Sequence, residues 1–543
     1  MSAADPATIP EMFARRLAAD ADVPFLLSSD GRSWTFRGLD HLAARLAEEL
    51  REQGVGEGDI IGLYQWNDTS WFVSALAVWR LGAVVACCGS VSPAAEAVRR
   101  FALVRPAIVL SSEPAVLDGF TVITVDESGQ VGGADAGSGP EASHGPAVTP
   151  SPDQPAAIFF TSGTTGDAKP VVKVHGQFPE AARATATAYS RSPSFRPRMA
   201  DSTKPPALGF NPFGQAACFG RLVFRLYIGR PLIQIRKFDV AVVQQLATRY
   251  DFDTLQLTPA MVHSLAFTDL DVSLGKLQYV SSGTAPLAPA TRDEFERRYG
   301  VPVLQAYGST EGGVTALERY DDVTAGRRGT GSVGRITAES TWRIVLGDGT
   351  DAAPGEEGEI LGKPRTVTMA EAGISALPLD ADGWYHTGDI GRVDEHGILY
   401  ITGRVKDMLI VGGFNVYPGE VEDALRESPL VRDAMVVGRK DERLGEIPVA
   451  ALVWNPAATR ERSEAEALAE VIERARGLLA AYKVPRRWLT VEAIPLTPNG
   501  KPDRLGLARR ADAESRSTAD ITVGAASAIV AARPEGGADG VRA

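Results

Sequence analysis

Residues Phe159–Lys169 read FFTSGTTGDAK, an apolar, strand-like start followed by a loop of hydroxyls and glycines that ends in a lysine. Glycine lacks a Cβ, so Gly163 and Gly166 let the backbone approach an anion closely. Hydroxyl groups can donate hydrogen bonds and the lysine adds positive charge. The stretch predicts a phosphate-binding loop, although it is not the GxxxxGK[ST] loop. The residues expected to hold phosphate are Thr161, Ser162, Gly163, Thr164, Thr165, Gly166 and Lys169.

Outward from this loop the chain alternates between helix and strand patterns. Apolar residues recur at helical spacing from Trp34 to about Leu50, and the strand-like IIGLY follows a glycine-containing turn. The segments WFVSALAVWRLGAVVACCG and FALVRPAIVLSS each repeat helix and buried strand. This order predicts an α/β fold whose parallel sheet is covered by helices.

The chain of 543 residues is too long for one ordinary core. The segment 127–155 is rich in Gly, Ala, Ser and Pro and predicts a flexible connection. After GRVKD the pattern restarts with a helix opened by Pro418 and two strands. We therefore expect a large multi-sheet N-terminal domain over 1–404, a small mobile α/β C-terminal domain over 405–510, and a disordered tail over 511–543.

Composition narrows the class of protein. A hydrophobic fraction of 44% with 23% charged residues is ordinary for a globular chain, and no apolar run is long enough to cross a bilayer. The first residues do not resemble a secretory signal, so we expect a cytoplasmic protein. The net charge of -12 disfavours a nucleic-acid partner, and the three cysteines have no ligand spacing for zinc. The oligomeric state stays open between monomer and homodimer.

Together with motifs further along, the glycine-rich loop resembles the signature TSGTTGxPKG of the acyl-adenylate-forming superfamily. This superfamily contains acyl-CoA synthetases, adenylation domains of nonribosomal peptide synthetases and luciferases, and the resemblance spans about Trp34 to Arg504. The chain departs from the signature at Asp167, Ala168 and Pro170. An aspartate adds negative charge and a proline removes a backbone hydrogen-bond donor. The loop could therefore bind phosphate more weakly or adopt a different shape.

The resemblance implies an ATP and Mg²⁺ site built from three further motifs. In SSGTAPL, the strip along one face of adenine would be Gly283, Thr284, Ala285 and Pro286. In QAYGSTEGG, Tyr307 would stack on adenine, Gly308 would border the substrate, Thr310 would touch a phosphate and Glu311 would help to hold magnesium. In the block from TGD to GRVKD, Asp389 would bind both ribose hydroxyls with help from Arg404.

The C-terminal motifs imply two half-reactions. A carboxylate that attacks the α-phosphorus of ATP needs a cation at the forming bond, and Lys501 in PLTPNGKPDR is the candidate. Lys406 occupies the position of the family's hinge, about which the small domain turns between adenylation and capture. Gly413 would let a slender thiol pass after that rotation. The expected acceptor is CoA or the phosphopantetheine arm of an acyl carrier protein.

The pocket for the acid is expected in LGFNPFGQAACFGRLVF. This stretch offers apolar and neutral side chains and lacks the aspartate that pairs with an amino group in amino-acid-activating relatives. An aryl, enoyl or fatty acid is therefore expected. Alternatives stay open: capture by a non-thiol nucleophile, activation of a small inorganic acid such as nitrite, or a catalytically silent relative that binds a ligand. The pocket residues are Asn211, Phe213, Gln215 and Cys218, with Gly283 and Gly308.

Overall fold

The structure is a computed structural model in which the chain forms two compact units. The first holds the residues up to Lys406 together with Leu496, and the second holds Asp407–Pro495 and the residues from Pro502. Among the helices it describes, none is both long and apolar enough to span a lipid bilayer. The described residues are 5–89, 92–126, 147–162, 168–189, 205–210, 212–329, 331–337, 340–364, 369, 373–374, 377–496 and 502–514. The expected flexible connection therefore falls largely outside them.

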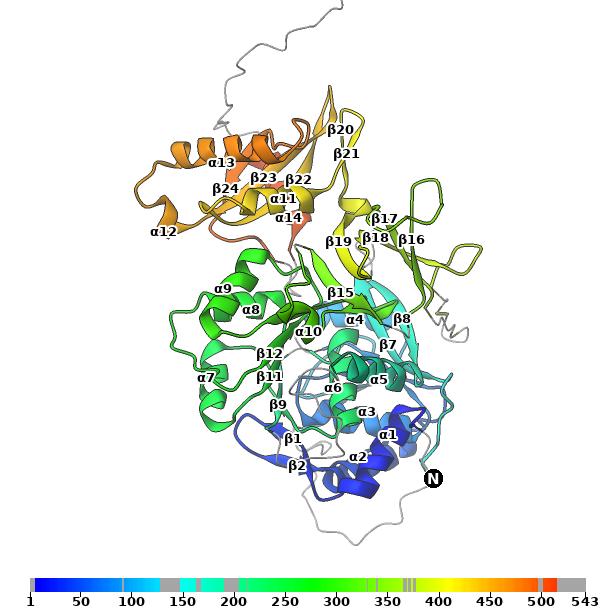
Figure 1. The fold of residues 1–543 in the computed structure, drawn as a ribbon. Coiled ribbons are helices and arrows are strands. Elements are labelled where there is room, and N and C mark those ends of the chain that lie inside the picture. Colours follow the sequence, from blue (N-terminus) through cyan, green and yellow to red (C-terminus); the bar gives the residue numbers. More distant parts are fainter. Residues whose placement is uncertain are drawn as a thin grey trace, which may run out of the picture. The chain divides into compact units, whose positions relative to one another are not determined.

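A six-stranded sheet carries the strand that precedes the phosphate loop (Figure 1). Its order is β6 (Val122–Thr124), β5 (Ile108–Ser111), β3 (Ile60–Tyr64), β4 (Val84–Cys87), β7 (Pro155–Ser162) and β8 (Ala168–Val174). All neighbours pair in parallel except β7 and β8, which form an antiparallel edge pair. The connecting helices are α3 (Thr69–Arg80) and α4 (Ala94–Ala102), with α1 (Ile9–Asp20) and α2 (Phe36–Glu52) packed nearby. The predicted α/β class is confirmed.

A nine-stranded sheet carries most of the other predicted site residues. It begins with three parallel strands, β11 (Thr254–Leu257), β12 (Tyr279–Ser282) and β13 (Val303–Ser309). Antiparallel strands follow in the order β14 (Gly313–Leu317), β15 (Ser332–Ile336), β19 (Ile398–Arg404), β18 (Tyr385–Val393), β17 (Gly358–Gly362) and β16 (Trp342–Val345). The helices of this region are α7 (Val240–Arg249), α8 (Pro259–Ala266), α9 (Pro289–Tyr299) and α10 (Tyr320–Thr324). The apolar cluster under α7, α8 and α9 supports the parallel strands.

Helices α5 (Gln177–Tyr189) and α6 (Ala216–Ile228) pack against each other in the first unit (Figure 1). The end of α6 is set by Gly229, whose φ of 67° is the left-handed conformation that glycine adopts without strain. A four-stranded sheet lies beyond, in the order β2 (Ser33–Thr35), β1 (Pro24–Ser28), β10 (Leu232–Gln234) and β9 (Ala207–Gly209). The second half of the expected acid-pocket stretch, with Cys218, lies in α6.

The second unit is a five-stranded sheet with helices. Its strands are β20 (Leu409–Val411), β21 (Phe414–Val416), β22 (Val431–Asp441), β23 (Gly445–Trp454) and β24 (Arg487–Thr490), and η2 (Val405–Asp407) spans the unit boundary. The helices are α11 (Pro418–Arg426), α12 (Pro456–Thr459), α13 (Glu464–Leu478) and α14 (Arg504–Glu514). Helix α13 starts with a capping box, in which Ser463 and Glu466 bond each other's backbone amides. Helix α14 runs four residues past residue 510 because Ala511 is buried in an apolar cluster.

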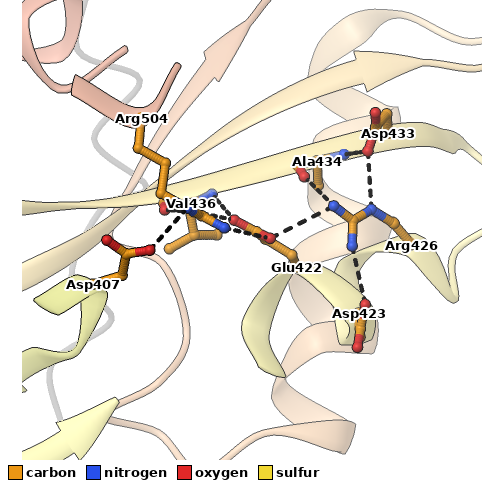
Figure 2. Close-up of polar contacts among 8 residues, drawn as sticks. All are labelled: Asp407, Glu422, Asp423, Arg426, Asp433, Ala434, Val436 and Arg504. Atoms are coloured by element: carbon orange, nitrogen blue, oxygen red, sulfur yellow. Dashed lines mark hydrogen bonds and ion pairs between the residues drawn. The ribbon is translucent and has the colours of Figure 1, made fainter. Parts of the chain in front are cut away.

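A buried ionic network joins α11, β22 and α14 in the second unit, and Figure 2 shows it. Glu422, only 5% exposed, accepts a hydrogen bond of 3.0 Å from Arg504 Nη2 and one of 2.7 Å from the Val436 amide. Arg504 also lies 3.7 Å from Asp407, the first residue of the unit. The members of the network are Asp407, Glu422, Asp423, Arg426, Asp433, Ala434, Val436 and Arg504.

Replacing Glu422 by glutamine is expected to destabilise the second unit by about 3 kcal/mol, because two half-buried guanidinium groups lose the buried carboxylate that they share. The measurement is hydrogen–deuterium exchange of the β22 amides, Val436 included. Glu427→Gln is the matched control, since Glu427 is 57% exposed and its ion pair with Arg474 is long, at 3.9 Å. Equal protection of β22 in the two variants would contradict this account of the network.

Candidate active site

The carboxylate of Asp389 is the centre of a polar cluster in the nine-stranded sheet. The Tyr307 hydroxyl donates a hydrogen bond of 2.6 Å to Oδ2. Arg404 Nε lies 2.6 Å from Oδ1 in an ion pair whose N–H does not point at the oxygen. Three predicted nucleotide-site residues from two separate motifs thus come together.

The local backbone explains how Asp389 is held. It stands opposite Arg404 in the ladder between β18 and β19. The Thr387 hydroxyl accepts a hydrogen bond from the Asp389 amide at 3.0 Å and donates one of 2.6 Å to the Ile360 carbonyl. Between these residues Gly388 has a φ of 71°. A carboxylate offers about four acceptor positions, so Asp389 keeps capacity for donors beyond Tyr307 and Arg404.

Tyr307 remains a hydrogen-bond donor over the physiological range. Burial, and next the adjacent Asp389 carboxylate, raise the pKa of the Tyr307 hydroxyl well above its ordinary value. The proton therefore stays on the phenol and points at Asp389. The ring of Tyr307 packs at the edge of a small apolar cluster in the same sheet.

A second cluster of polar side chains surrounds Glu311 in the turn between β13 and β14. The buried Lys173 of β8 donates a hydrogen bond of 2.7 Å from Nζ to the Glu311 main-chain carbonyl. Burial, and next the Glu311 carboxylate, raise the pKa of Tyr385 to about 12. Arg404 and Asp389 also act on the Tyr385 hydroxyl, so this group adjoins the Asp389 cluster. Thr310 lies half-buried in the same turn.

In the described part of the chain, no three His, Cys, Asp or Glu side chains converge as a set that could hold a metal ion. Magnesium in nucleotide enzymes commonly takes one or two protein carboxylates and otherwise phosphate oxygens and water. The donor set around Glu311 suits such an ion, because it offers one hard carboxylate beside a phenol.

The loop that follows β12 has an unusual backbone. Thr284 has a φ of 77°, a left-handed conformation that costs a β-branched residue on the order of 1–3 kcal/mol. A Cβ at Gly283 would stand 2.9 Å from the Ala306 carbonyl oxygen, so only glycine fits against β13 there. Ala285 is half-buried and Pro286 is exposed.

The phosphate loop lies only partly within the described residues. Thr161 and Lys169 face each other across the antiparallel pair of β7 and β8, and Lys169 is exposed. Pro170 lies in the edge strand β8, the kind of strand in which a missing N–H is tolerated. Ser162 ends β7, and the predicted phosphate residues Gly163, Thr164, Thr165 and Gly166 are outside the described residues, as is Asp167.

The expected acid pocket lies at the start of α6. Gln215 is the N-cap residue, and Cys218 Sγ donates to its Oε1 at 3.6 Å. Burial raises the pKa of the Cys218 thiol to about 11, so the thiol is neutral. Phe213 is buried against Trp71, with ring centroids 5.2 Å apart. Gly308 is exposed near the end of β13, and Asn211 is outside the described residues.

Among the C-terminal residues, Lys406 is exposed in η2, immediately before Asp407, where the second unit begins. Gly412 and Gly413 form the turn between β20 and β21 with φ values of 60° and 88°. Positive φ at both turn positions is typical of a two-residue hairpin, which gives Gly413 a backbone reason of its own. A Cβ there would meet nothing within 4 Å in this arrangement, and the thiol passage stays a prediction. Lys501 is outside the described residues.

Two residues of the cluster are absent from the sequence predictions. Lys173 is only 6% exposed, and alternation along β8 puts it on the same face as Lys169, which was a usable signal. Tyr385 and Asp389 both lie on β18, but the register shifts between them and Gly388 has a positive φ, so simple alternation does not predict their common location. The partner of Lys173 is 138 residues away, so its role is visible only in the folded chain.

Comparison with known proteins agrees with this geometry. The family model described as AMP-binding enzyme matches residues 13–370, and that of the AMP-binding enzyme C-terminal domain matches 420–501. A Rhodococcus jostii CoA ligase for 3-[(3aS,4S,7aS)-7a-methyl-1,5-dioxo-octahydro-1H-inden-4-yl]propanoate is 30% identical, covering 91% of this chain and 97% of the relative. The long-chain-fatty-acid–CoA ligase FadD13 of Mycobacterium tuberculosis is 30% identical, covering 86% and 92%.

A solved structure, MatB from Rhodopseudomonas palustris with bound ATP, superposes with a TM-score of 0.79 at 26% identity, covering 93% of this chain and 99% of that one. The resemblance predicted from the motifs is confirmed. The chain belongs to the family of AMP-binding enzymes and is an adenylate-forming acid–thiol ligase.

Proposed function

We propose that the enzyme joins a carboxylic acid of aryl, enoyl or fatty type to AMP and then transfers the acyl group to the thiol of CoA. In the first step a carboxylate oxygen bonds to the α-phosphorus of ATP and pyrophosphate leaves. In the second, a thiolate sulfur bonds to the acyl carbon, AMP leaves, and the thiol proton passes to solvent. The observation that carries the proposal is the Asp389 carboxylate, held by Tyr307 and Arg404 next to the Glu311 turn.

Each part of the nucleotide has a candidate partner. The ribose hydroxyls would donate to Asp389, adenine would lie on Tyr307 and along the loop from Gly283 to Pro286, and the phosphates would meet Lys169 and Thr310. Glu311 would hold magnesium, which, when bound, shields charge on the phosphate oxygens. Lys501 would stabilise charge at the forming carboxyl–phosphate bond.

The acceptor and the acid differ in how well they are supported. Curated relatives are named as CoA ligases, which favours CoA over a carrier-bound phosphopantetheine arm. Their named acids range from sulfoacetate and indoleacetate to long-chain fatty acids, so relatives do not select one acid class.

The function is tested by acid-dependent ATP–pyrophosphate exchange over a broad panel of carboxylic acids, followed by mass spectrometry of the product with CoA present. We expect exchange without CoA and an acyl-CoA product with it. Nitrite and amine arms are included in the same panel. Turnover with nitrite alone, or an amide in place of a thioester, would overturn the proposal.

Replacing Asp389 by asparagine is expected to raise the KM for ATP by on the order of tenfold to 100-fold, because a charged acceptor of two ribose hydroxyls is lost. Tyr307→Phe removes only the donor to Asp389 and keeps the ring, so its effect on KM should be smaller. Asp382→Asn, at an exposed turn before β18, is the matched control and should leave the KM unchanged. The measurement is initial exchange rate against ATP concentration, and an unchanged KM in Asp389→Asn would remove Asp389 from the ribose site.

A further inference from the structure

Helix α6 carries two arginines on the face that also carries Cys218. Arg221 and Arg225 follow Cys218 at spacings of three and seven residues, so the three side chains lie along one stripe of the helix. Arg225 is only 5% exposed although it is charged. Burial lowers the pKa of its guanidinium to about 10, which still leaves it protonated at neutral pH.

Neither guanidinium has its full set of partners. Arg221 Nη1 and Arg225 Nε are buried without a hydrogen-bond acceptor within the part of the chain that the structure describes. The neighbouring Arg230 shows the usual arrangement for comparison. It forms an ion pair with Asp253 and donates to the Pro205 carbonyl at 3.0 Å and to Thr254 at 3.4 Å. An unpaired buried charge lowers the stability of the fold by several kcal/mol. We therefore expect Arg221 and Arg225 to bind an anion that the described residues do not supply.

Within the described residues the surroundings of the two arginines are mainly aromatic and polar, and the Arg225 guanidinium carbon lies 5.5 Å from the centroid of the Phe224 ring. Tyr189, at the end of α5, packs against Tyr279 with ring centroids 5.7 Å apart and lies near Ser281. Arg221 and Arg225 both lie close enough to Tyr189 for their charges to lower its pKa against the larger effect of burial. Asp253 also acts on Arg225 across space, but its carboxylate is bonded to Arg230.

This region adjoins the expected acid pocket from two sides. Arg221 lies near enough to Cys218 to act on the pKa of its thiol. Ser281 lies on β12, two residues before Gly283, whose loop is the expected wall of both the nucleotide and the acid site. An acid that entered between α6 and this loop would reach the arginines with the end remote from the reacting carboxylate.

We propose that the acid substrate carries a second anionic group, a carboxylate, sulfonate or phosphonate, which Arg221 and Arg225 bind at the far end of the acyl pocket. The inference rests on the proposed function and names the substrate class of the same site. It also changes the expectation drawn from Phe213, Gln215 and Cys218, because binding would rest on ion pairing as well as on burial. The shared chemistry of the three anions is a planar or tetrahedral oxyanion that a guanidinium fork can bond with two N–H groups.

Helix geometry sets the spacing of the two arginines along α6. With a rise of about 1.5 Å per residue, Arg221 lies roughly 4.5 Å and Arg225 about 10 Å along the axis from Cys218. A long unbranched fatty acid would place apolar carbons against two unpaired charges, which disfavours it.

The test compares matched acids on the wild-type enzyme. Each pair has one acyl skeleton and differs at the far end: a carboxylate or sulfonate against the methyl ester or methyl group of similar shape. We expect kcat/KM for adenylation to favour the dianionic member by on the order of 100-fold, with the position of the optimum chain length reporting the pocket depth. The carboxylate and sulfonate arms show which anion the site prefers.

Variants then connect the preference to the two arginines. Arg225→Met and Arg221→Met should each lose most of the preference while the neutral acid is used as well as before or better. Arg225→Lys keeps the charge but not the planar fork and should retain part of it. Thermal unfolding gives a second readout: Arg225→Met should be at least as stable as wild type because an unpaired charge is removed. The matched control Arg230→Met should be less stable because Asp253 loses its partner.

The failures of the two proposals are distinguishable. Efficient use of neutral acids with no gain from a second anion, or a preference unchanged in Arg221→Met and Arg225→Met, would overturn this inference and leave acyl adenylation intact. Absence of pyrophosphate exchange with every acid, dianionic ones included, would overturn the proposed function itself. Marked destabilisation by Arg225→Met would identify the arginine as a structural group and count against the inference.

Discussion

Lys501→Ala is expected to lower ATP–pyrophosphate exchange by on the order of 100-fold to 1000-fold while most of the thiol transfer from supplied acyl-AMP remains. The first half-reaction brings a carboxylate to a polyanion, and a cation at the forming bond stabilises the charge that develops there. In the second half-reaction that bond already exists, so the same cation is no longer required. The measurement is each half-reaction separately, exchange without thiol and CoA acylation from synthetic acyl-AMP.

The structure describes the chain from Pro502 onward, which follows this lysine in the sequence. Arg504, three residues further on, is bonded to Glu422 and the Val436 carbonyl and lies by Asp407 (Figure 2). The chain after the lysine is therefore fixed to the body of the second unit. Lys440→Ala is the matched control, since Lys440 is exposed on β22 and should alter neither half-reaction. If exchange were unchanged in Lys501→Ala, or if both half-reactions fell together, Lys501 would not have the proposed role.

The local motifs predicted the order of the helices and strands and the polar cluster around Asp389. The spacing of apolar residues and the positions of turn residues predicted the strand before the phosphate loop and the helix opened by Pro418. They also predicted the parallel arrangement of the six-stranded sheet. The resemblance brought Tyr307, Asp389 and Arg404 into one expected site, and they lie within hydrogen-bond or ion-pair distance. These elements and this cluster could be predicted because they depend on residues close in sequence and on motifs whose residue types indicate their chemistry.

Pairing between distant residues was not predictable. Arg221, Arg225 and Arg230 look alike in the sequence. Among the residues that the structure describes, Arg230 alone of the three forms an ion pair, because the fold brings Asp253 to it. Gly413 is predicted to let a thiol pass, and the sequence did not show that its positive φ in a hairpin turn is a second reason for glycine there. In both cases the deciding fact is a tertiary contact or a backbone angle, which residue type alone does not encode.

Lys173→Met is expected to raise the KM for MgATP and to lower kcat of adenylation, each by about tenfold, because the turn that contains Glu311 loses the hydrogen bond from Lys173. Lys173 is almost wholly buried, and its Nζ bonds the Glu311 carbonyl at 2.7 Å, which ties the strand after the phosphate loop to that turn. Burial, opposed by the Glu311 charge, lowers the pKa of Lys173 to about 8. Without the lysine the carbonyl is left unpaired, at a cost of about 1–3 kcal/mol, and the carboxylate proposed for magnesium is less well oriented.

A positioning role has a signature that a general loss of stability does not. Adenylation in Lys173→Met should need more magnesium for half-maximal rate, and binding of MgATP by calorimetry should weaken, while CoA acylation from supplied acyl-AMP stays near wild type. Lys237→Met, at an exposed position of the same unit, should change none of these quantities. Equal losses in both half-reactions, or a magnesium dependence like that of wild type, would show that Lys173 supports the fold and not the Glu311 turn.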